Sequence, residues 1–405
     1  MKGTIQIGNS FHPDQHVGVE AARIPNVRRE ALDGLRGYAA LAVAFCHDIL
    51  HFDTSLIERV LYRPIVLVDR AGLHAKILLI PFNGESAVIA FFILSGFVLR
   101  GALDRMAAQP FHKAALAFSW RRIVRIYPAV ITCMMLFFLM SWASAKAGIT
   151  TFPQFAPIQL LQNATLYAPV MHGPSWSVQV EICAVPFLLA AEGLRRLWGI
   201  LGLLVALFYG LVAIEYPVLV GNLPALWPYL FMFFIGMLVA QRSVAEVTGR
   251  LHPATWVVAL LLFLAGRHIT ARAAISGLIA QRFAGGVLIA CVAYRDDMLA
   301  AFLRRPVSLF LGRISYSFYL LNVVALYTVW AVIEVGVPRP SHHPVFWGLV
   351  SAITSVLLTL PAAFLSERFV ERPCVTAGRS LMRLRHLGRR PFLTEGLVSQ
   401  PTSEI

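Results

Sequence analysis

The chain has 405 residues, of which 58% are hydrophobic and only 14% are charged, and its formal net charge is +14. This composition excludes a water-soluble globular protein of this size and indicates a polytopic membrane protein. The positive charge does not indicate a nucleic-acid partner, because the basic residues lie in short connections between apolar segments and in the tail. This distribution is typical of membrane proteins, whose cytoplasmic loops are rich in Lys and Arg.

About ten apolar segments are long enough to cross a hydrocarbon core of roughly 30 Å. None of them alternates as the strands of a membrane β-barrel do, so we expect an all-α polytopic membrane protein. Their even number and the distribution of Lys and Arg predict that both termini are cytoplasmic. The segments centre on residues 32–51, 77–100, 123–143, 176–194, 197–215, 224–241, 254–271, 274–293, 309–333 and 345–366.

Three regions follow from this pattern. Residues 1–27 are predicted to be a cytoplasmic lead without a cleavable signal peptide, residues 28–375 a membrane domain, and residues 376–405 a basic, disordered cytoplasmic tail. The longer outer connections, residues 52–76 and 145–175, are candidates for a substrate site. The five cysteines are scattered without a CxxC pair, which argues against a metal site or a disulfide framework.

The first apolar segment carries a polar stripe. Arg36 and His47 are eleven residues apart, which is three helical turns plus about 20°, so they share one face about 16 Å apart. Asp33 lies next to Arg36 on this face, and His51 continues the line. An arginine at mid-bilayer costs at least about 2.5 kcal/mol, so this face is predicted to line a polar site. The alternatives are a helix-end Arg36 paired with Asp33 and a His47 that serves only helix packing.

Five ordered motifs accompany this stripe and cover most of the chain. They are LDGLRG at Leu32–Gly37 with its following His47, AVIAFFILSGFVL at Ala87–Leu99, RRIVRIYP at Arg121–Pro128, PSWSVQVE at Pro174–Glu181 and FLGRISYSFYLLN at Phe310–Asn322, followed by ERFVERP. In these motifs the chain resembles the membrane-bound acyltransferase family 3, integral membrane proteins that O-acylate sugars and related acceptors. It departs from the family in having Asn322 where a His is frequent, and Ile89 where an acidic residue is common, with Glu85 one turn earlier.

The resemblance implies roles for the motif residues. His47 would be the general base for an acceptor hydroxyl, and Arg36 would hold donor phosphates or stabilise developing negative charge. Glu181 would orient or polarise His47 or the acceptor hydroxyl. The donor-binding candidates form a basic group at the start of one span, where a positive-inside anchor is the alternative: Arg121, Arg122, Arg125 and Tyr127. The acceptor-binding candidates are Trp176, Ser177, Asp33, Glu85, Tyr316 and Asn322. Ser95 and Gly96 are expected to serve helix packing.

The expected function is therefore that of an integral membrane O-acyltransferase of the bacterial inner membrane, acting most simply as an O-acetyltransferase. It would move an acyl group from cytoplasmic acetyl-CoA or another acyl-CoA to a hydroxyl of a surface or lipid-linked carbohydrate. No permanently bound cofactor, metal or nucleic-acid partner is expected, and the sequence leaves the oligomeric state open. The alternative is a secondary transporter or exporter of a polysaccharide or small solute, because ionisable residues within the membrane also mark transport pathways. We find no related halves of the kind that many transporters have.

Overall fold

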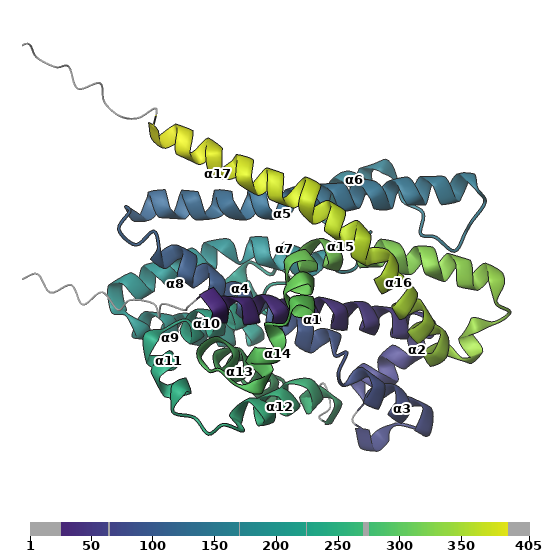
Figure 1. The fold of residues 1–405 in the computed structure, drawn as a ribbon, viewed down its shortest axis with the longest axis horizontal. Coiled ribbons are helices and arrows are strands. Elements are labelled where there is room, and N and C mark those ends of the chain that lie inside the picture. Colours follow the sequence, from purple (N-terminus) through teal and green to yellow (C-terminus); the bar gives the residue numbers. More distant parts are fainter. Residues whose placement is uncertain (1–25, 64, 170, 224, 270–274, 388–405) are drawn as a thin grey trace, which may run out of the picture.

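The computed structural model describes residues 26–387 except residues 64, 170, 224 and 270–274. No β-strand occurs in this part of the chain, which confirms the predicted all-α class. Figure 1 shows an elongated helical bundle in which α1, α5, α15 and α16 run lengthwise.

The longest helices supply the frame of the bundle. They are α1 (Asn26–His51), α4 (Gly84–Asp104), α5 (Phe111–Lys146), α13 (Ile275–Tyr294), α15 (Pro306–Gly336) and α16 (Pro344–Ser366). The shorter helices are α2 (Thr54–Ile57), α3 (Arg70–Leu79), α6 (Pro157–Ala164), α7 (Ser175–Cys183), α8 (Val185–Trp198), α9 (Ile200–Glu215), α10 (Leu230–Val239), α11 (Arg242–Gly249), α12 (Thr255–Ile269), α14 (Met298–Leu303) and α17 (Arg372–Leu387).

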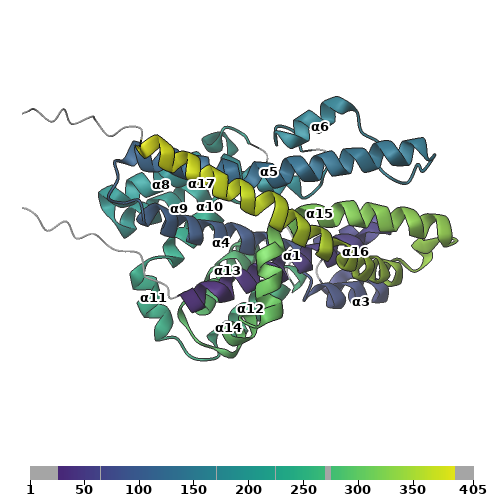
Figure 2. The ribbon, with the colours of Figure 1, turned by 45° about the horizontal axis from the view of Figure 1, so that its top comes forward.

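Five helical stretches within the described residues are long and apolar enough to cross a membrane: Gly72–Asp104, Phe111–Lys146, Ser175–Trp198, Pro306–Gly336 and Pro344–Ser380. Each of the ten predicted segments overlaps a helix, but the apolar stretches in α9, α10, α12 and α13 are shorter than a full span. The count of ten spans and the cytoplasmic termini therefore stay predictions. The described chain begins and ends towards the same end of the bundle in both views, as an even number of crossings requires (Figures 1 and 2).

Helix α1 is the central element and contacts α4, α13, α14, α15 and α16. Glycines make its approach to α14 and α15 close: a Cβ atom on Gly312 of α15 would lie 2.2 Å from the carbonyl oxygen of Asp33, and one on Gly34 would lie 2.1 Å from that of Leu303 at the end of α14. Small residues at such crossings let membrane helices approach to backbone contact. Two of the sequence motifs, LDGLRG and FLGRISYSFYLLN, therefore pack directly on each other.

A buried carboxylate fixes the rotation of α1 about its own axis. Asp48 is fully buried and accepts hydrogen bonds from Ser351 Oγ at 2.5 Å and Ser355 Oγ at 3.0 Å, both on α16. Buried carboxylates are stable in a protein interior only with such partners. Arg36 lies about 120° away from Asp48 around the helix axis, so its side chain is turned away from this contact with α16.

The predicted disordered tail is wrong for residues 376–387, which form most of α17. A π-helical turn at Glu367–Glu371 connects α16 to α17, which packs against α5 (Figures 1 and 2). Sequence reading missed this helix because its partner is distant in the chain: Trp120 donates its indole N–H to the carbonyl oxygen of Gly378 at 3.3 Å. The rest of the predicted tail, residues 388–405, and residues 1–25 of the predicted lead lie outside the described residues.

Candidate active site

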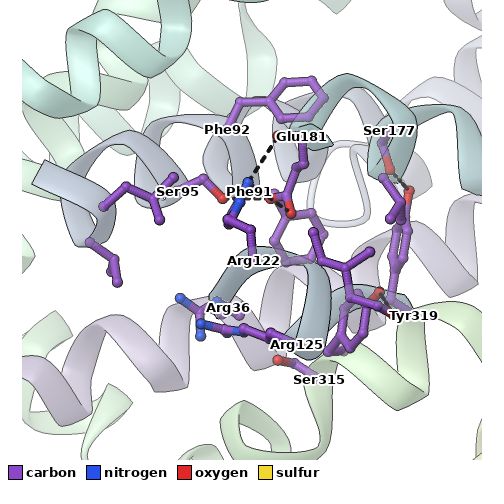
Figure 3. A pocket seen from close by; sticks show the side chains of 15 residues that line it. Arg36, Phe91, Phe92, Ser95, Arg122, Arg125, Ser177, Glu181, Ser315 and Tyr319 are labelled. Atoms are coloured by element: carbon purple, nitrogen blue, oxygen red, sulfur yellow. Dashed lines mark hydrogen bonds and ion pairs between the residues drawn. The ribbon is translucent and has the colours of Figure 1, made fainter. Parts of the chain in front are cut away.

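A chamber lies among α1, α4, α5, α7 and α15, and all five recognised motifs contribute to its wall (Figure 3). Its volume is about 70 Å³, enough for a narrow chemical group. The lining residues are Arg36, Phe91, Phe92, Ser95, Val98, Leu99, Arg122, Arg125, Ile126, Ser177, Val178, Glu181, Ser315, Tyr316 and Tyr319. The predicted site residues Arg36, Arg122, Arg125, Ser177, Glu181 and Tyr316 thus meet in one place.

Glu181 on α7 is the acidic residue of the chamber wall. Its carboxylate accepts a hydrogen bond from Ser95 Oγ at 2.5 Å and pairs with Arg122, whose Nη2 atom lies 3.4 Å from Oε2 (Figure 3). The same Arg122 nitrogen donates to the backbone oxygen of Glu181 at 3.2 Å. The side chains of Arg122 and Glu181 are 7% and 19% exposed, so the pair is largely withdrawn from solvent. Ser95 therefore has a polar role in the site besides the packing role expected from sequence.

Three guanidinium groups converge on this carboxylate. Arg36 lies within electrostatic reach of Arg122, Arg125 and Glu181, and Figure 3 shows Arg36 and Arg125 with their guanidinium groups together. Arg36 also pairs with Asp33, whose carboxylate lies 3.2 Å away and is 53% exposed at the edge of the site. Positive charge therefore exceeds negative charge in the chamber, which suits it to binding an anion or stabilising a developing one.

Helix α15 closes the opposite wall with tyrosines whose hydroxyl groups are engaged. Tyr316 donates to the carbonyl oxygen of Ile126 at 3.0 Å, and Tyr319 hydrogen-bonds with Ser177 Oγ at 2.7 Å and donates to the carbonyl oxygen of Pro174 at 3.2 Å. These bonds hold α15 to α5 and to the start of α7. These hydrogen bonds indicate that Tyr316 and Tyr319 hold neighbouring helices together, although both also line the chamber.

A larger, basic groove adjoins the chamber between α4, α5 and α17. Its volume is about 490 Å³, and it shares Val98, Leu99, Arg122 and Arg125 with the chamber wall, so the two spaces are contiguous. Arg121, which is exposed, lines the groove and not the chamber. The basic motif of α5 therefore lies where the wider groove meets the narrower chamber.

His47 is not among the residues that line the chamber or the groove. It lies three turns along α1 from Arg36, about 16 Å by helix geometry, and is close enough to His51 and His172 to interact with them electrostatically. The structure does not bring His47 and Arg36 into one cavity. Near Arg36, α1 packs against α14 and α15, whereas Asp48, next to His47, contacts α16. Sequence reasoning placed the two on one stripe but had no means of predicting this separation.

His172 is a residue that sequence reasoning missed. It is fully buried, lies 2.8 Å from Ser175 Oγ through Nδ1 and 2.7 Å from the carbonyl oxygen of Leu320 through Nε2. It therefore contacts the segment of α15 that carries Tyr319, a residue of the chamber wall. A lone histidine in an irregular connection has no periodic pattern that marks it as functional. Its place two residues before Pro174, where the PSWSVQVE motif begins, is the sequence feature that could have drawn attention to it.

The remaining predicted residues do not line the chamber. Trp176 packs its ring on Tyr229 with centroids 5.0 Å apart, and Tyr127 donates to the carbonyl oxygen of Thr165 at 3.3 Å. Glu85 is half-buried in the first turn of α4. Asn322 is 1% exposed, and among the described residues neither amide atom of its side chain has a hydrogen-bond partner.

The comparisons with known proteins agree with this arrangement. A family model described as an acyltransferase domain matches residues 29–366. Acyltransferase MdmB of Streptomyces mycarofaciens is 26% identical over 406 aligned positions, which cover 90% of this chain and 94% of that protein. No solved structure matches the chain. Because the family model covers most of the chain and its motifs form the chamber, the protein is a transferase of acyl groups that belongs to the membrane-bound acyltransferase family 3.

Proposed function

We propose that the protein is an integral membrane O-acyltransferase of the bacterial inner membrane that uses cytoplasmic acyl-CoA and acylates a hydroxyl of a surface or lipid-linked carbohydrate. The observation that carries this proposal is the contiguity of the basic groove and the chamber, which share Arg122 and Arg125. A donor with phosphates at one end and a thioester at the other suits a wide, basic groove that leads into a narrow chamber. The preference for acetyl, and for a carbohydrate acceptor, rests on the family resemblance.

The arginines have a defined task in this proposal. Arg122 and Arg125 hold the donor's phosphates where the groove meets the chamber, and Arg36 adds a third guanidinium on the chamber side. Glu181, fixed by Ser95 and Arg122, keeps these like charges together and orients them. The thioester end of the donor then extends through the chamber towards the part of α1 that carries His47.

The chemical step joins the acceptor oxygen to the acyl carbon. The acceptor hydroxyl attacks the thioester carbonyl while His47 takes its proton, and the carbon–sulfur bond then breaks to release the CoA thiol, which receives a proton in turn. In the present structure Ser177 and Tyr319 are part of the chamber wall, and His172 lies close enough to His47 to interact with it electrostatically. Catalytic contacts are often long before substrates bind, so this proposal requires the wall to open when donor and acceptor are bound.

Label transfer from radioactive acetyl-CoA tests the proposal. Membranes that contain the protein should move label onto a glycan, and His47→Gln should lower the rate by about 10²- to 10⁴-fold, because a general base contributes that much. His74→Gln is the matched control, since His74 is exposed on α3 and lines neither space. Undiminished transfer by His47→Gln would place the base elsewhere, with Glu181 the next residue to replace.

The same assay separates the enzyme from a transporter. A secondary transporter moves an unmodified solute and has no need of the donor, whereas the proposed enzyme leaves the solute in place and changes its mass by one acyl unit. Mass spectrometry of the glycans then names both the acyl chain and the acceptor. Solute movement without any label transfer would overturn the proposal.

A further inference from the structure

Helix α17 forms one wall of the basic groove, although it lies beyond the match to the family model, which ends at residue 366. We propose that the groove binds the phosphorylated nucleotide end of acyl-CoA and that Arg379 of α17 is one of its phosphate-binding residues. This inference rests on the proposed function, because it assumes a CoA donor. It extends the donor site to a helix that the family motifs do not include.

The charge of the groove points to a polyanionic ligand. Five arginines line it and no acidic side chain does, among the residues that the structure describes: Arg105, Arg121, Arg122, Arg125 and Arg379. Exposed arginines are ordinarily mixed with carboxylates on a protein surface, and a concave site of one sign concentrates counter-ions. Guanidinium groups match phosphate in geometry as well as charge, because each offers two parallel N–H donors.

The size and lining of the groove fit a nucleotide. Its volume of about 490 Å³ falls within the roughly 300 to 1,000 Å³ that is typical of small-molecule sites. Phe118, which is buried, and Trp120, a residue that is 38% exposed, line it beside the arginines. An aromatic ring next to guanidinium groups is what a purine base with attached phosphates requires for stacking and charge pairing.

Helix α17 is held firmly enough to take part in such a site. Gly378 is buried against α5, where a Cβ atom would lie 2.5 Å from Val124 Cγ1, and its carbonyl oxygen accepts from Trp120. At the other end, Ser317 of α15 hydrogen-bonds with Ser366 at 2.7 Å and with Glu371, which anchors the π-helical turn. The start of α17 is therefore fixed on α5 and α15.

Arg379 follows Gly378 directly, so its position at the groove is determined by this contact. Its side chain is exposed, and within the described part of the chain it makes no hydrogen bond or ion pair. A positively charged group in a basic groove that has no counter-ion among the described residues gains most from an anionic ligand.

Equilibrium binding to the purified full-length protein in phosphatidylcholine vesicles tests the inference without knowledge of the acceptor. Radiolabelled CoA and radiolabelled pantetheine, which lacks the nucleotide, are the two probes. Arg379→Gln should weaken CoA binding by about tenfold, the equivalent of about 1.4 kcal/mol, and should leave pantetheine binding unchanged. Arg379→Lys keeps the charge but not the two parallel N–H donors, so it should recover part of the affinity that Arg379→Gln loses.

Arg368→Gln is the matched control, because Arg368 is an exposed arginine of the same C-terminal segment that stacks on Phe369 and does not line the groove. It should bind CoA as the wild type does. Equal losses in Arg379→Gln and Arg368→Gln, or an equal loss for CoA and pantetheine, would overturn the inference and leave α17 a structural role.

Two further outcomes separate the possible failures. If the wild type binds CoA and Arg379→Gln binds it equally well, this inference is wrong while the proposed function stands. If the wild type binds no CoA at all, the proposed function itself fails. A lipid headgroup offers the same phosphate chemistry, so the measurement is repeated in phosphatidylglycerol vesicles. If Arg379→Gln alters only the association with that lipid, the groove is a lipid site and the inference is wrong.

Discussion

Replacing Glu181 by Gln removes the one carboxylate among the described residues of the chamber wall. The change keeps the size of the side chain and an acceptor for Ser95, so its main effect is the loss of negative charge beside Arg122. At the 3.4 Å separation of Oε2 and Nη2, and an effective dielectric constant of about 20, this attraction is about 5 kcal/mol. Desolvation offsets part of it, and breaking one side of a buried pair typically costs roughly 3 to 5 kcal/mol.

We expect Glu181→Gln to lower the free energy of unfolding by about 3 kcal/mol, because Arg122 and its neighbours Arg36 and Arg125 are left facing one another. Equilibrium unfolding in mixed micelles, followed by circular dichroism, measures this change. The double variant Arg122→Gln/Glu181→Gln should lose less than the sum of the two single variants, with a coupling energy of about 2 kcal/mol.

Glu246→Gln provides the matched control. Glu246 pairs with Arg242 at 3.0 Å on α11, but both side chains are more than half exposed, so the same chemical change should alter the unfolding free energy by less than about 0.5 kcal/mol. Simple additivity of the two chamber substitutions, or a Glu181→Gln effect no larger than that of this control, would contradict a buried charge pair between Glu181 and Arg122.

Two glycine substitutions test the packing that builds the site. Gly96→Ala should lower the unfolding free energy by about 3 kcal/mol, because its Cβ atom would lie 2.0 Å from the carbonyl oxygen of Phe233. Gly101→Ala, whose nearest such neighbour is 3.8 Å away, should be harmless in the same measurement, and equal effects would contradict the packing. Gly378→Val should detach α17 from Val124, so that limited trypsin digestion cleaves α17 sooner while the unfolding free energy of the remainder changes by less than about 1 kcal/mol. Unchanged cleavage of α17 would mean that Gly378 does not hold it.

Much of the fold was predictable, because long apolar segments in a membrane have one way to satisfy their backbone groups. All ten predicted segments overlap helices for this reason. The candidate site was predictable in part. Motif residues as far apart as Arg36, Glu181 and Tyr316 do meet in the chamber, since each is a polar residue whose cost in the membrane is reduced by a shared polar space.

Other parts of the site had no local signal. The hydrogen bond between Ser95 and Glu181 joins residues 86 positions apart, and the contact of Trp120 with Gly378 joins residues 258 positions apart. Helix α17 in particular depends on that distant surface of α5. The composition of its residues is that of a solvated basic tail, because a helix that packs on the surface of another helix needs few apolar residues of its own.

The helical membrane class, the family and the set of polar residues that must avoid lipid can be predicted from the amino-acid sequence, because hydropathy, motif spacing and charge are properties of the chain. Which of those residues share a space depends on how the helices pack. Arg36 and His47 occupy one face of α1, yet only Arg36 reaches the chamber. A helix fixes the directions of its own side chains, but the helices packed against each of its turns determine what those side chains contact.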